Sequence, residues 1–136
     1  MLTISTDPSL VDVALVHRWL STVAYWALGR PREVVERSVA ESLNVGAYDD
    51  GVQVGYARVV TDRATFGWVC DVYVDPSRRG DGIGNRLISS VLAELAPLGL
   101  QRVMLATADA HALYAAHGFE PLPNASMIMV LRQPED

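Results

Sequence analysis

The most informative stretch of the chain is DVYVDPSRRGDGIGNRL, residues 71–87. It begins in a segment rich in valine and aromatic residues, typical of a strand, and ends in an apolar stripe with helical spacing. Three alternate glycines therefore lie between a strand and a helix. Backbone N–H groups in a first helical turn have no partner within the helix and lie at the positive end of its dipole. Because glycine lacks a Cβ, an anion can reach these groups, and the sequence predicts a pyrophosphate site.

Two familiar phosphate-binding motifs are excluded in this stretch. The string GxxxxGK[ST] of a P-loop does not occur in the chain. The dinucleotide motif GxGxxG, counted from Gly80, would need a glycine where the chain has Asn85. What remains is Arg79-x-x-Gly82-x-Gly84, flanked by two further arginines.

The residues after this loop alternate between helical and strand patterns. The apolar stripe predicts a long helix that stops at a proline and a glycine. Asp109 is placed to cap a second helix, which Gly118 would end. The segments expected here are a helix over 83–95, a strand over 103–106, a helix over 109–117 and a final strand over 127–131.

The residues before the loop predict further strands and two helices. Ser9 and Asp12 are spaced as in a capping box, with Asp in place of Glu, and would open the first helix. Pro31 suits the first position of the second helix, which the apolar spacing extends to Leu43. Residues 49–51, Asp-Asp-Gly, are a hairpin signal. The strands expected here cover residues 2–5, 45–48, 52–61 and 68–75.

These segments predict a mixed α/β fold in a single domain, residues 1–136. The chain is long enough for one core and too short for two, with 50% apolar and 20% charged residues. The connection from the strand at 68–75 to the strand at 103–106 is long enough for a parallel crossover, which is right-handed as a rule.

Composition argues against several classes of function. The formal net charge is −5, so a general nucleic-acid binder is not expected. Cys70 is the only cysteine, which excludes an intrachain disulfide or a cysteine-rich zinc site and favours a reducing, cytoplasmic compartment. The three histidines show no metal-binding spacing, and no secretory signal or membrane-spanning run is recognised. We therefore expect no metal and no membrane association.

Two motifs together resemble the GNAT superfamily of N-acetyltransferases. Arg79-x-x-Gly82-x-Gly84 is similar to its acyl-CoA-binding motif, and LYAAHGF, residues 113–119, looks like its late YxxxGF junction between helix and strand. The resemblance covers most of the chain. It implies a GNAT-like acyl-CoA N-acyltransferase fold, with a central, mostly antiparallel sheet, a splayed pair of parallel strands and flanking helices.

The resemblance also implies an activity: transfer of an acetyl group from acetyl-CoA to a primary amine, by direct attack within a ternary complex. The acceptor region looks aromatic and compact, which favours a small-molecule amine over a protein. A homodimer stays open, because relatives are often dimers and a C-terminal strand can pair across the interface.

Carried over residue by residue, the resemblance places the cofactor along the loop. The backbone of Val72 and Val74 would pair with the pantetheine arm, residues 79–85 would hold the pyrophosphate, and Tyr114 would lie beside the CoA sulfur. The residues expected to bind the cofactor are Val72, Tyr73, Val74, Arg78, Arg79, Gly80, Asp81, Gly82, Ile83, Gly84, Asn85, Arg86 and Tyr114.

Beyond cofactor binding, acetyl transfer requires few further functional groups. Holding the amine and the thioester together can supply up to about 7–11 kcal/mol of the barrier. The Val74 N–H would stabilise the oxyanion, and the Tyr114 hydroxyl would give a proton to the leaving thiolate. A protonated amine must first lose its proton, and Asp71, Asp62 or His111 could accept it, with Asp71 taken as the catalytic candidate.

The acceptor residues have ordinary alternatives. We expect Tyr25, Trp26, Arg30 and Asp71 to bind the acceptor. The aromatic pair could instead pack on the sheet, and Arg30, like Arg58, could bind an acceptor carboxylate or pair with surface acids. Asp71 could accept hydrogen bonds from a neighbouring loop, because an unpaired carboxylate in an apolar strand is costly. Tyr114 could likewise be a core tyrosine with a satisfied hydroxyl.

Two positions depart from the family pattern and keep other functions open. Asp81 lies where many relatives have Lys or Arg, and should weaken the local positive field. Thr107 lies where many have an Asn that touches the cofactor arm. The alternatives are a non-catalytic acyl-CoA-binding sensor or partner module, and an unrelated nucleotide-binding domain that would prefer ATP to CoA.

Overall fold

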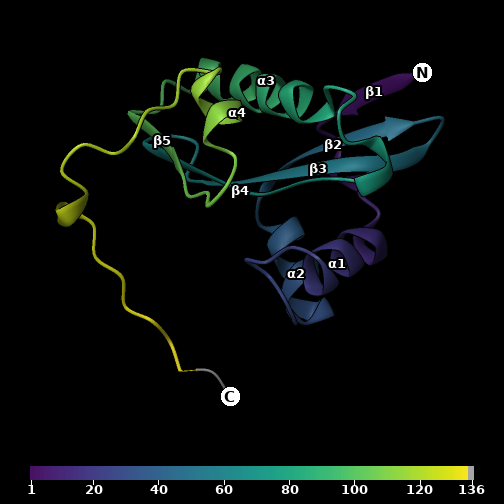
Figure 1. The fold of residues 1–136 in the computed structure, drawn as a ribbon, viewed down its shortest axis with the longest axis horizontal. Coiled ribbons are helices and arrows are strands. Elements are labelled where there is room, and N and C mark those ends of the chain that lie inside the picture. The colour runs from purple at the N-terminus through teal and green to yellow at the C-terminus, as the bar shows by residue number, and fades with distance from the viewer. Residues whose placement is uncertain (135–136) are drawn as a thin grey trace.

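A computed structural model describes residues 1–134 (Figure 1). Its strands are β1 (Leu2–Ser5), β2 (Leu43–Asp49), β3 (Val52–Thr61), β4 (Phe66–Val74) and β5 (Arg102–Leu105). Its α-helices are α1 (Val13–Thr22), α2 (Arg32–Ala40), α3 (Ile83–Leu95) and α4 (His111–Ala115). Short 3₁₀ turns cover Pro8–Leu10, Pro76–Arg78, Ala96–Leu98 and Ala125–Met127.

The strands form one sheet in the order β1-β2-β3-β4-β5. All neighbours are antiparallel except β4 and β5, which are parallel. Helices α3 and α4 cover one face of the sheet, and α1 and α2 cover the other (Figure 1). The expected mixed α/β fold, with a mostly antiparallel sheet and one parallel pair, is confirmed.

Helix α3 carries the apolar stripe that the sequence predicts. Its inward residues are buried against β2, β3 and β4, and each such side chain contributes roughly 1.5–3 kcal/mol on burial. This packing fixes the rotation of the helix, and with it the direction of the first turn after the glycine loop. The buried residues are Ile83, Leu87, Ile88, Val91 and Leu95.

Both N-terminal helices begin at other residues than predicted. The capping box is wrong: Asp12 is itself the N-cap of α1, and its carboxylate accepts from the Leu15 N–H at 3.1 Å. Ser9 lies in the preceding 3₁₀ turn. Pro31 is the N-cap of α2 rather than its first residue, and Leu43 belongs to β2 rather than to the helix.

Strand β4 contains a bulge at Asp71. Asp71 and Val72 together lie opposite the single residue Ala57 of β3. Asp71 has φ +52°, a left-handed conformation that Asp tolerates better than most residues. The bulge shifts the alternation of side chains, so that Asp71 and Tyr73 face α1 and α2, while Val72 and Val74 pack on the α3 side.

The parallel strands β4 and β5 separate before β4 ends. Their pairing stops at Val69 and Leu105. Residues 70–74 of β4 therefore have no strand partner on that side within residues 1–134. The splayed parallel pair expected from the resemblance is present.

The C-terminal part differs from the prediction in two respects. Asp109 makes no side-chain cap to α4; the Thr107 hydroxyl instead accepts from the Ala110 N–H at 3.0 Å. The predicted strand over 127–131 is wrong, because Met127 ends a 3₁₀ turn and residues 128–134 have no regular secondary structure. This tail runs away from the sheet (Figure 1). A strand needs a neighbour to satisfy its backbone, and none lies beside this segment in the described chain.

Candidate active site

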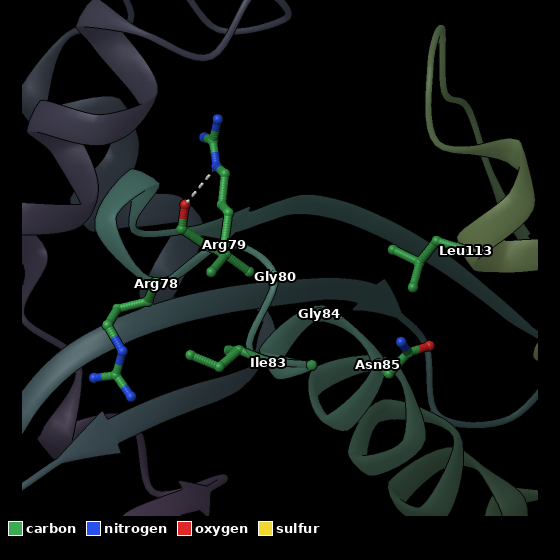
Figure 2. A pocket seen from close by; sticks show the side chains of 9 residues that line it. Arg78, Arg79, Gly80, Ile83, Gly84, Asn85 and Leu113 are labelled. Carbon is green, nitrogen blue, oxygen red and sulfur yellow. Dashed lines mark hydrogen bonds between the residues drawn. The ribbon is translucent and has the colours of Figure 1, made fainter.

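The glycine loop opens into a cavity of about 380 Å³, here called the glycine cavity (Figure 2). It lies between the end of β4, the first turn of α3 and the start of the α4 region. All but one of its lining residues come from the stretch that begins at the end of β4. The residues are Val74, Arg78, Arg79, Gly80, Gly82, Ile83, Gly84, Asn85 and Leu113.

Two of the three glycines are needed for their backbone conformation. Gly80 has φ +90° and Gly82 has φ +80°, values that side chains disfavour. A Cβ built on either would meet no atom within 4 Å, so both face open space. Gly84 is different, because it has no positive φ and a Cβ there would lie 3.7 Å from Leu113. At all three positions the absence of a side chain leaves the backbone accessible.

The first turn of α3 supplies the donors of the cavity. The first hydrogen bond of the helix runs from the Arg86 N–H to the Gly82 carbonyl at 3.2 Å. The N–H groups of residues 83–85 therefore have no partner inside the helix. Together with the helix dipole they can hold an anion, and the surrounding open space suits a pyrophosphate.

The arginines of the loop are less free than the sequence suggests. Arg78 forms ion pairs with Asp49 at 2.8 Å and with Asp81 at 3.1 Å. Arg79 donates from Nε to the Val74 carbonyl at 3.2 Å, and its guanidinium lies 5.1 Å from the centroid of the Tyr73 ring. Asp81 thus lowers the positive field, as expected, by direct pairing with Arg78.

The end of β4 presents backbone groups to the gap. The Asp75 N–H donates to the Val54 carbonyl of β3 at 2.9 Å. Since successive N–H groups of a strand point to opposite edges, those of Val74 and Val72 point away from β3, toward the space that β5 leaves. Val74 lines the glycine cavity, and Val72 lines a second cavity beside it.

The second cavity, here called the aromatic cavity, measures about 310 Å³. It brings together residues from the α1–α2 connection, β3, β4 and the segment leading into α4. All of the residues predicted to bind the acceptor line it, and so does Tyr114. The lining residues are Tyr25, Trp26, Arg30, Arg58, Trp68, Val69, Cys70, Asp71, Val72, Ala106, Thr107, Asp109, Ala110 and Tyr114.

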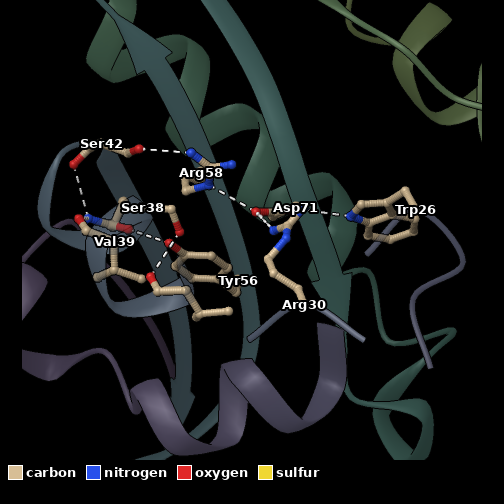
Figure 3. A network of polar contacts seen from close by, with 10 residues as sticks. Trp26, Arg30, Ser38, Val39, Ser42, Tyr56, Arg58 and Asp71 are labelled. Atoms are coloured by element: carbon tan, nitrogen blue, oxygen red, sulfur yellow. Dashed lines mark hydrogen bonds and ion pairs between the residues drawn. The ribbon is translucent and has the colours of Figure 1, made fainter. Parts of the chain in front are cut away.

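Asp71 is the centre of a polar network in this cavity (Figure 3). Its Oδ1 accepts from the Trp26 indole N–H at 2.9 Å. Its Oδ2 accepts from Arg30 at 2.8 Å and from Arg58 at 2.9 Å. Burial alone would raise the pKa of Asp71, but Arg58 and Arg30 outweigh it and hold the pKa below its usual range. Asp71 therefore stays ionised and is a poor proton acceptor.

The network continues to the residues that follow α2. Arg58 also donates to the Ser42 hydroxyl at 3.0 Å. Nearby, the Tyr56 hydroxyl donates to the Asn44 side chain, whose own amide donates to the Val39 carbonyl at 2.9 Å. Arg58 is thus held at both ends of its guanidinium, and the position of the Asp71 carboxylate is fixed with it.

Tyr114 lies at the α4 side of the aromatic cavity. Its side chain is buried and packs edge-on against Phe119, with ring centroids 5.9 Å apart. Burial raises the pKa of Tyr114, and Tyr25 and Asp109 act in the same direction. The phenol is therefore protonated at neutral pH and can act as a proton donor.

Several predicted residues lie outside both cavities. Tyr73 packs its ring against Trp19 in the α1–α2 core, and Arg86 is exposed on α3. Of the other two proposed proton acceptors, Asp62 is held by backbone N–H groups of the β3–β4 turn, and His111 is exposed. The Asp62 hydrogen bonds lower the pKa of this carboxyl, so it is also a poor base.

Sequence reasoning missed Asp109 and Trp68 as cavity residues. Of these two residues, only Asp109 lies near a recognised motif, five positions before the tyrosine of the second motif.

Asn85 also has a partner that the sequence did not predict, since its Oδ1 lies 3.0 Å from His117 Nε2. Cys70 lines the aromatic cavity, but burial raises the pKa of its thiol to about 11, so it is not a nucleophile at neutral pH.

Residues 1–134 contain neither a candidate metal site nor a candidate membrane span. No group of three or more His, Cys, Asp or Glu side chains is arranged to hold a metal ion there. None of the helices in this range combines the length and apolar character that crossing a membrane requires.

Comparison with known proteins identifies the family. The sequence profile of the acetyltransferase (GNAT) family matches residues 14–119, a span that includes every residue of both cavities. The chain belongs to the GNAT family. It is accordingly an acyl-CoA-dependent acetyltransferase.

Individual relatives agree with this assignment. A candidate acetyltransferase from Gibberella zeae is 30% identical, over 78% of this chain and 71% of the relative. The crystal structure of a candidate GNAT acetyltransferase from Xanthomonas campestris pv. campestris is 42% identical, with a TM-score of 0.90 over 98% of this chain and 94% of that one. A Mycobacterium tuberculosis protein, solved in complex with CoA, is 25% identical with a TM-score of 0.74, over 89% and 73% of the two chains.

Proposed function

We propose that this GNAT enzyme, as one domain over residues 1–136, transfers the acetyl group of acetyl-CoA to a primary amine of a small molecule within a ternary complex. The observation that carries the proposal is that two cavities lie along the splayed part of β4, where Val74 lines one and Val72 lines the other. Each cavity can hold one reactant. The aromatic cavity, at about 310 Å³, is at the small end of ligand sites, which favours a small acceptor.

The residues of the glycine cavity fit coenzyme A. Open space above Gly80 and Gly82, and the N–H groups of residues 83–85, suit its pyrophosphate. The backbone of Val72 and Val74 suits the amide groups of its pantetheine arm. Arg79 would then release the Val74 carbonyl to an N–H of the arm. When bound, acetyl-CoA supplies an activated thioester carbonyl.

The residues of this chain hold the two reactants in position and supply one N–H donor and one proton donor. The Val74 N–H points into the gap and can donate to an oxygen on which negative charge develops. The Tyr114 phenol, protonated at neutral pH, can give its proton to the sulfur that leaves. Tyr114 is buried and Val74 is half-buried, so both groups are partly shielded from water.

Asp71 has a positioning role in this proposal rather than the role of a base. Its two oxygens already accept from Trp26, Arg30 and Arg58. Losing its charge would leave the two largely buried guanidinium groups of Arg30 and Arg58 without a common partner. The carboxylate therefore fixes the wall of the aromatic cavity, and the proton of the amine leaves by another route.

The direct test combines binding with turnover. Coenzyme A should raise the melting temperature of the protein, and acetyl-CoA with a library of small amines should release free thiol. Protection by coenzyme A without thiol release on any amine would overturn the small-molecule acceptor. Stronger protection by ATP than by coenzyme A would overturn the proposed use of the glycine cavity.

We also propose a homodimer in a reducing, cytoplasmic setting, the latter consistent with the single cysteine. Met127–Leu131 is a run of five apolar residues, each more than half exposed. Strand β5 is at the edge of the sheet and has one free side within the described chain. Such a run pairs readily with an open edge, here that of a second copy.

Light scattering after size exclusion tests the dimer. The chain should elute with twice its mass of 14.8 kDa, and Met129→Asp, in the most exposed position of the run, should shift it to the monomer. A monomeric wild-type chain, or a dimer that Met129→Asp leaves intact, would overturn this interface.

A further inference from the structure

The aromatic cavity holds charges of both signs at different places. Arg30 and Arg58 share the buried carboxylate of Asp71, so the β4 wall carries one net positive charge. Asp109, on the segment leading into α4, is exposed and lines the same cavity. The cavity as a whole is therefore close to neutral but polarised.

Arg30 and Arg58 have N–H groups that make no hydrogen bond within the described residues. Each guanidinium has five N–H groups. Arg30 uses one toward Asp71, and Arg58 uses one toward Asp71 and one toward Ser42. Their side chains are 22% and 13% exposed, so they reach the cavity while being largely shielded from water. A pair of fixed guanidinium groups in this setting recognises a carboxylate.

The Asp109 side of the cavity also contains Tyr114, since both residues line it. The negative charge of Asp109 helps to raise the pKa of the Tyr114 phenol. Within the lining of this cavity, Asp109 and Asp71 are the two carboxylates, and Asp71 is already saturated by its three donors. An ammonium group that enters the cavity is thus drawn toward Asp109, beside Tyr114.

The remaining surface is aromatic and apolar. Tyr25 and Trp26 form an edge-to-face pair with centroids 5.0 Å apart, and Trp68, Val69 and Val72 line the same space. This surface suits an apolar body between the two charged ends of an acceptor.

We propose, on the basis of the function proposed above, that the acceptor is a small amine that also carries a carboxylate and an apolar side chain, as an apolar amino acid does. The carboxylate would bind to Arg30 and Arg58, and the ammonium would lie toward Asp109. The ammonium first releases one proton to solvent water. The neutral nitrogen then forms a bond to the acetyl carbon and loses a second proton as it becomes an amide. The carbon–sulfur bond breaks, the sulfur receives a proton from the Tyr114 phenol, and the second proton of the nitrogen restores the phenol through solvent water.

Matched pairs of amines test this. Thiol release is measured for L-phenylalanine against phenethylamine, and for L-methionine against 3-(methylthio)propylamine. In each pair the two compounds differ by the carboxylate alone. We expect a kcat/KM on the order of tenfold or more higher for the member with the carboxylate, as a charge-assisted contact implies. Equal values in both pairs, or a preference for the members without a carboxylate, would overturn the proposal.

Two variants test the arginine end and the Asp109 end of the aromatic cavity one at a time. Arg30→Gln should reduce the preference within each pair to near one, whereas the exposed Arg32→Gln, which lines neither cavity, should leave it unchanged. Asp109→Asn should raise KM for both members of a pair and leave their ratio intact, with exposed Glu120→Gln as its control. A preference that survives in Arg30→Gln and in Arg58→Lys would overturn the role of the arginine pair.

Product binding distinguishes this failure from failure of the proposed function. The affinity of N-acetyl-L-phenylalanine and of N-acetylphenethylamine is measured by calorimetry on the protein saturated with coenzyme A. Tighter binding of the carboxylate compound supports the inference even where no amine is turned over. Equal binding of the two compounds, with turnover of other amines, overturns the inference and leaves the acetyltransferase function intact.

Discussion

The two cavities that lie along β4 are built in different ways. The glycine cavity takes eight of its nine lining residues from positions 74–85, and its donors are backbone N–H groups. The aromatic cavity takes its residues from four separate segments, and its polar groups are side chains. In its central network, Trp26 and Asp71 are 45 positions apart in the sequence.

This contrast shows how each half of the site depends on the fold. A site made of consecutive backbone groups needs only a strand, a turn and a helix in the correct order. A site made of converging side chains needs the register of the sheet and the placement of the α1–α2 connection. Substitutions should therefore affect binding in the first cavity, and both catalysis and stability in the second.

The largest effect is expected from Tyr114→Phe, which removes the proposed acid and keeps the ring. Turnover should fall by about 10²–10⁴-fold, the usual contribution of a positioned proton donor. Thermal protection by coenzyme A should remain, because the glycine cavity is intact. Steady-state thiol release measures the loss.

Tyr48→Phe is the matched control for this change. The Tyr48 hydroxyl is buried without a hydrogen-bond partner and lines neither cavity, so its removal should leave turnover near the wild-type value. Wild-type turnover in Tyr114→Phe would remove Tyr114 from the mechanism.

Asp71→Asn should lower the stability of the folded protein, because Asp71 holds the residues that line the aromatic cavity together. It leaves the Arg30 and Arg58 charges without their shared partner, and we expect the free energy of unfolding at pH 7 to fall by about 3–5 kcal/mol. Asn tolerates the left-handed backbone at this position, so the bulge is kept. Chemical denaturation gives the difference.

The pH dependence of the free energy of unfolding tests whether the Asp71 ion pairs cause this loss of stability. The pKa of Asp71 is lowered by folding, so its contribution is present above the ordinary Asp value of about 3.9 and is lost as the pH falls through the folded value. The difference between Asp71→Asn and wild type should shrink in that range. Asp50→Asn, exposed and also at positive φ, should change the free energy of unfolding little at any pH.

Gly82→Ala should weaken coenzyme A binding in the glycine cavity. At φ +80° a side chain costs about 1–2 kcal/mol of stability, and the methyl group would occupy space proposed for the pyrophosphate. We expect the Kd for coenzyme A to rise by roughly tenfold, or about 1.4 kcal/mol. Gly99→Ala shares the positive φ and the open surroundings but lies after α3, so it should lose stability without losing affinity.

The smallest effect is expected from Asp81→Asn, which releases one partner of Arg78. The positive field of the glycine cavity should increase, and coenzyme A should bind about two- to fivefold more tightly at low salt. The gain should disappear at high ionic strength, because exposed charges are screened. Unchanged or weaker affinity at low salt would show that Arg78 does not contribute to binding.

The order of elements around the glycine loop was predictable, whereas the ends of several elements were not. The α3 stripe and the loop are local patterns, and both have the predicted form. The start of α1 at Asp12 depends on a competition between two neighbouring caps, because Asp7 engages Ser9 at 2.9 Å. The absence of a strand at 127–131 depends on what lies beside that segment, which its apolar composition does not specify.

The strand, the glycine turn and the helix of residues 71–87 could be predicted from local sequence, because backbone conformation and helix-end donors depend on neighbouring residues alone. That Asp71 is a shared ion-pair partner of Arg30 and Arg58, and that Asp109 lines the aromatic cavity with Tyr114, follows from the folded chain alone. Both outcomes require side chains from distant segments to meet, and the bulge in β4 and the splay of β5 bring them together.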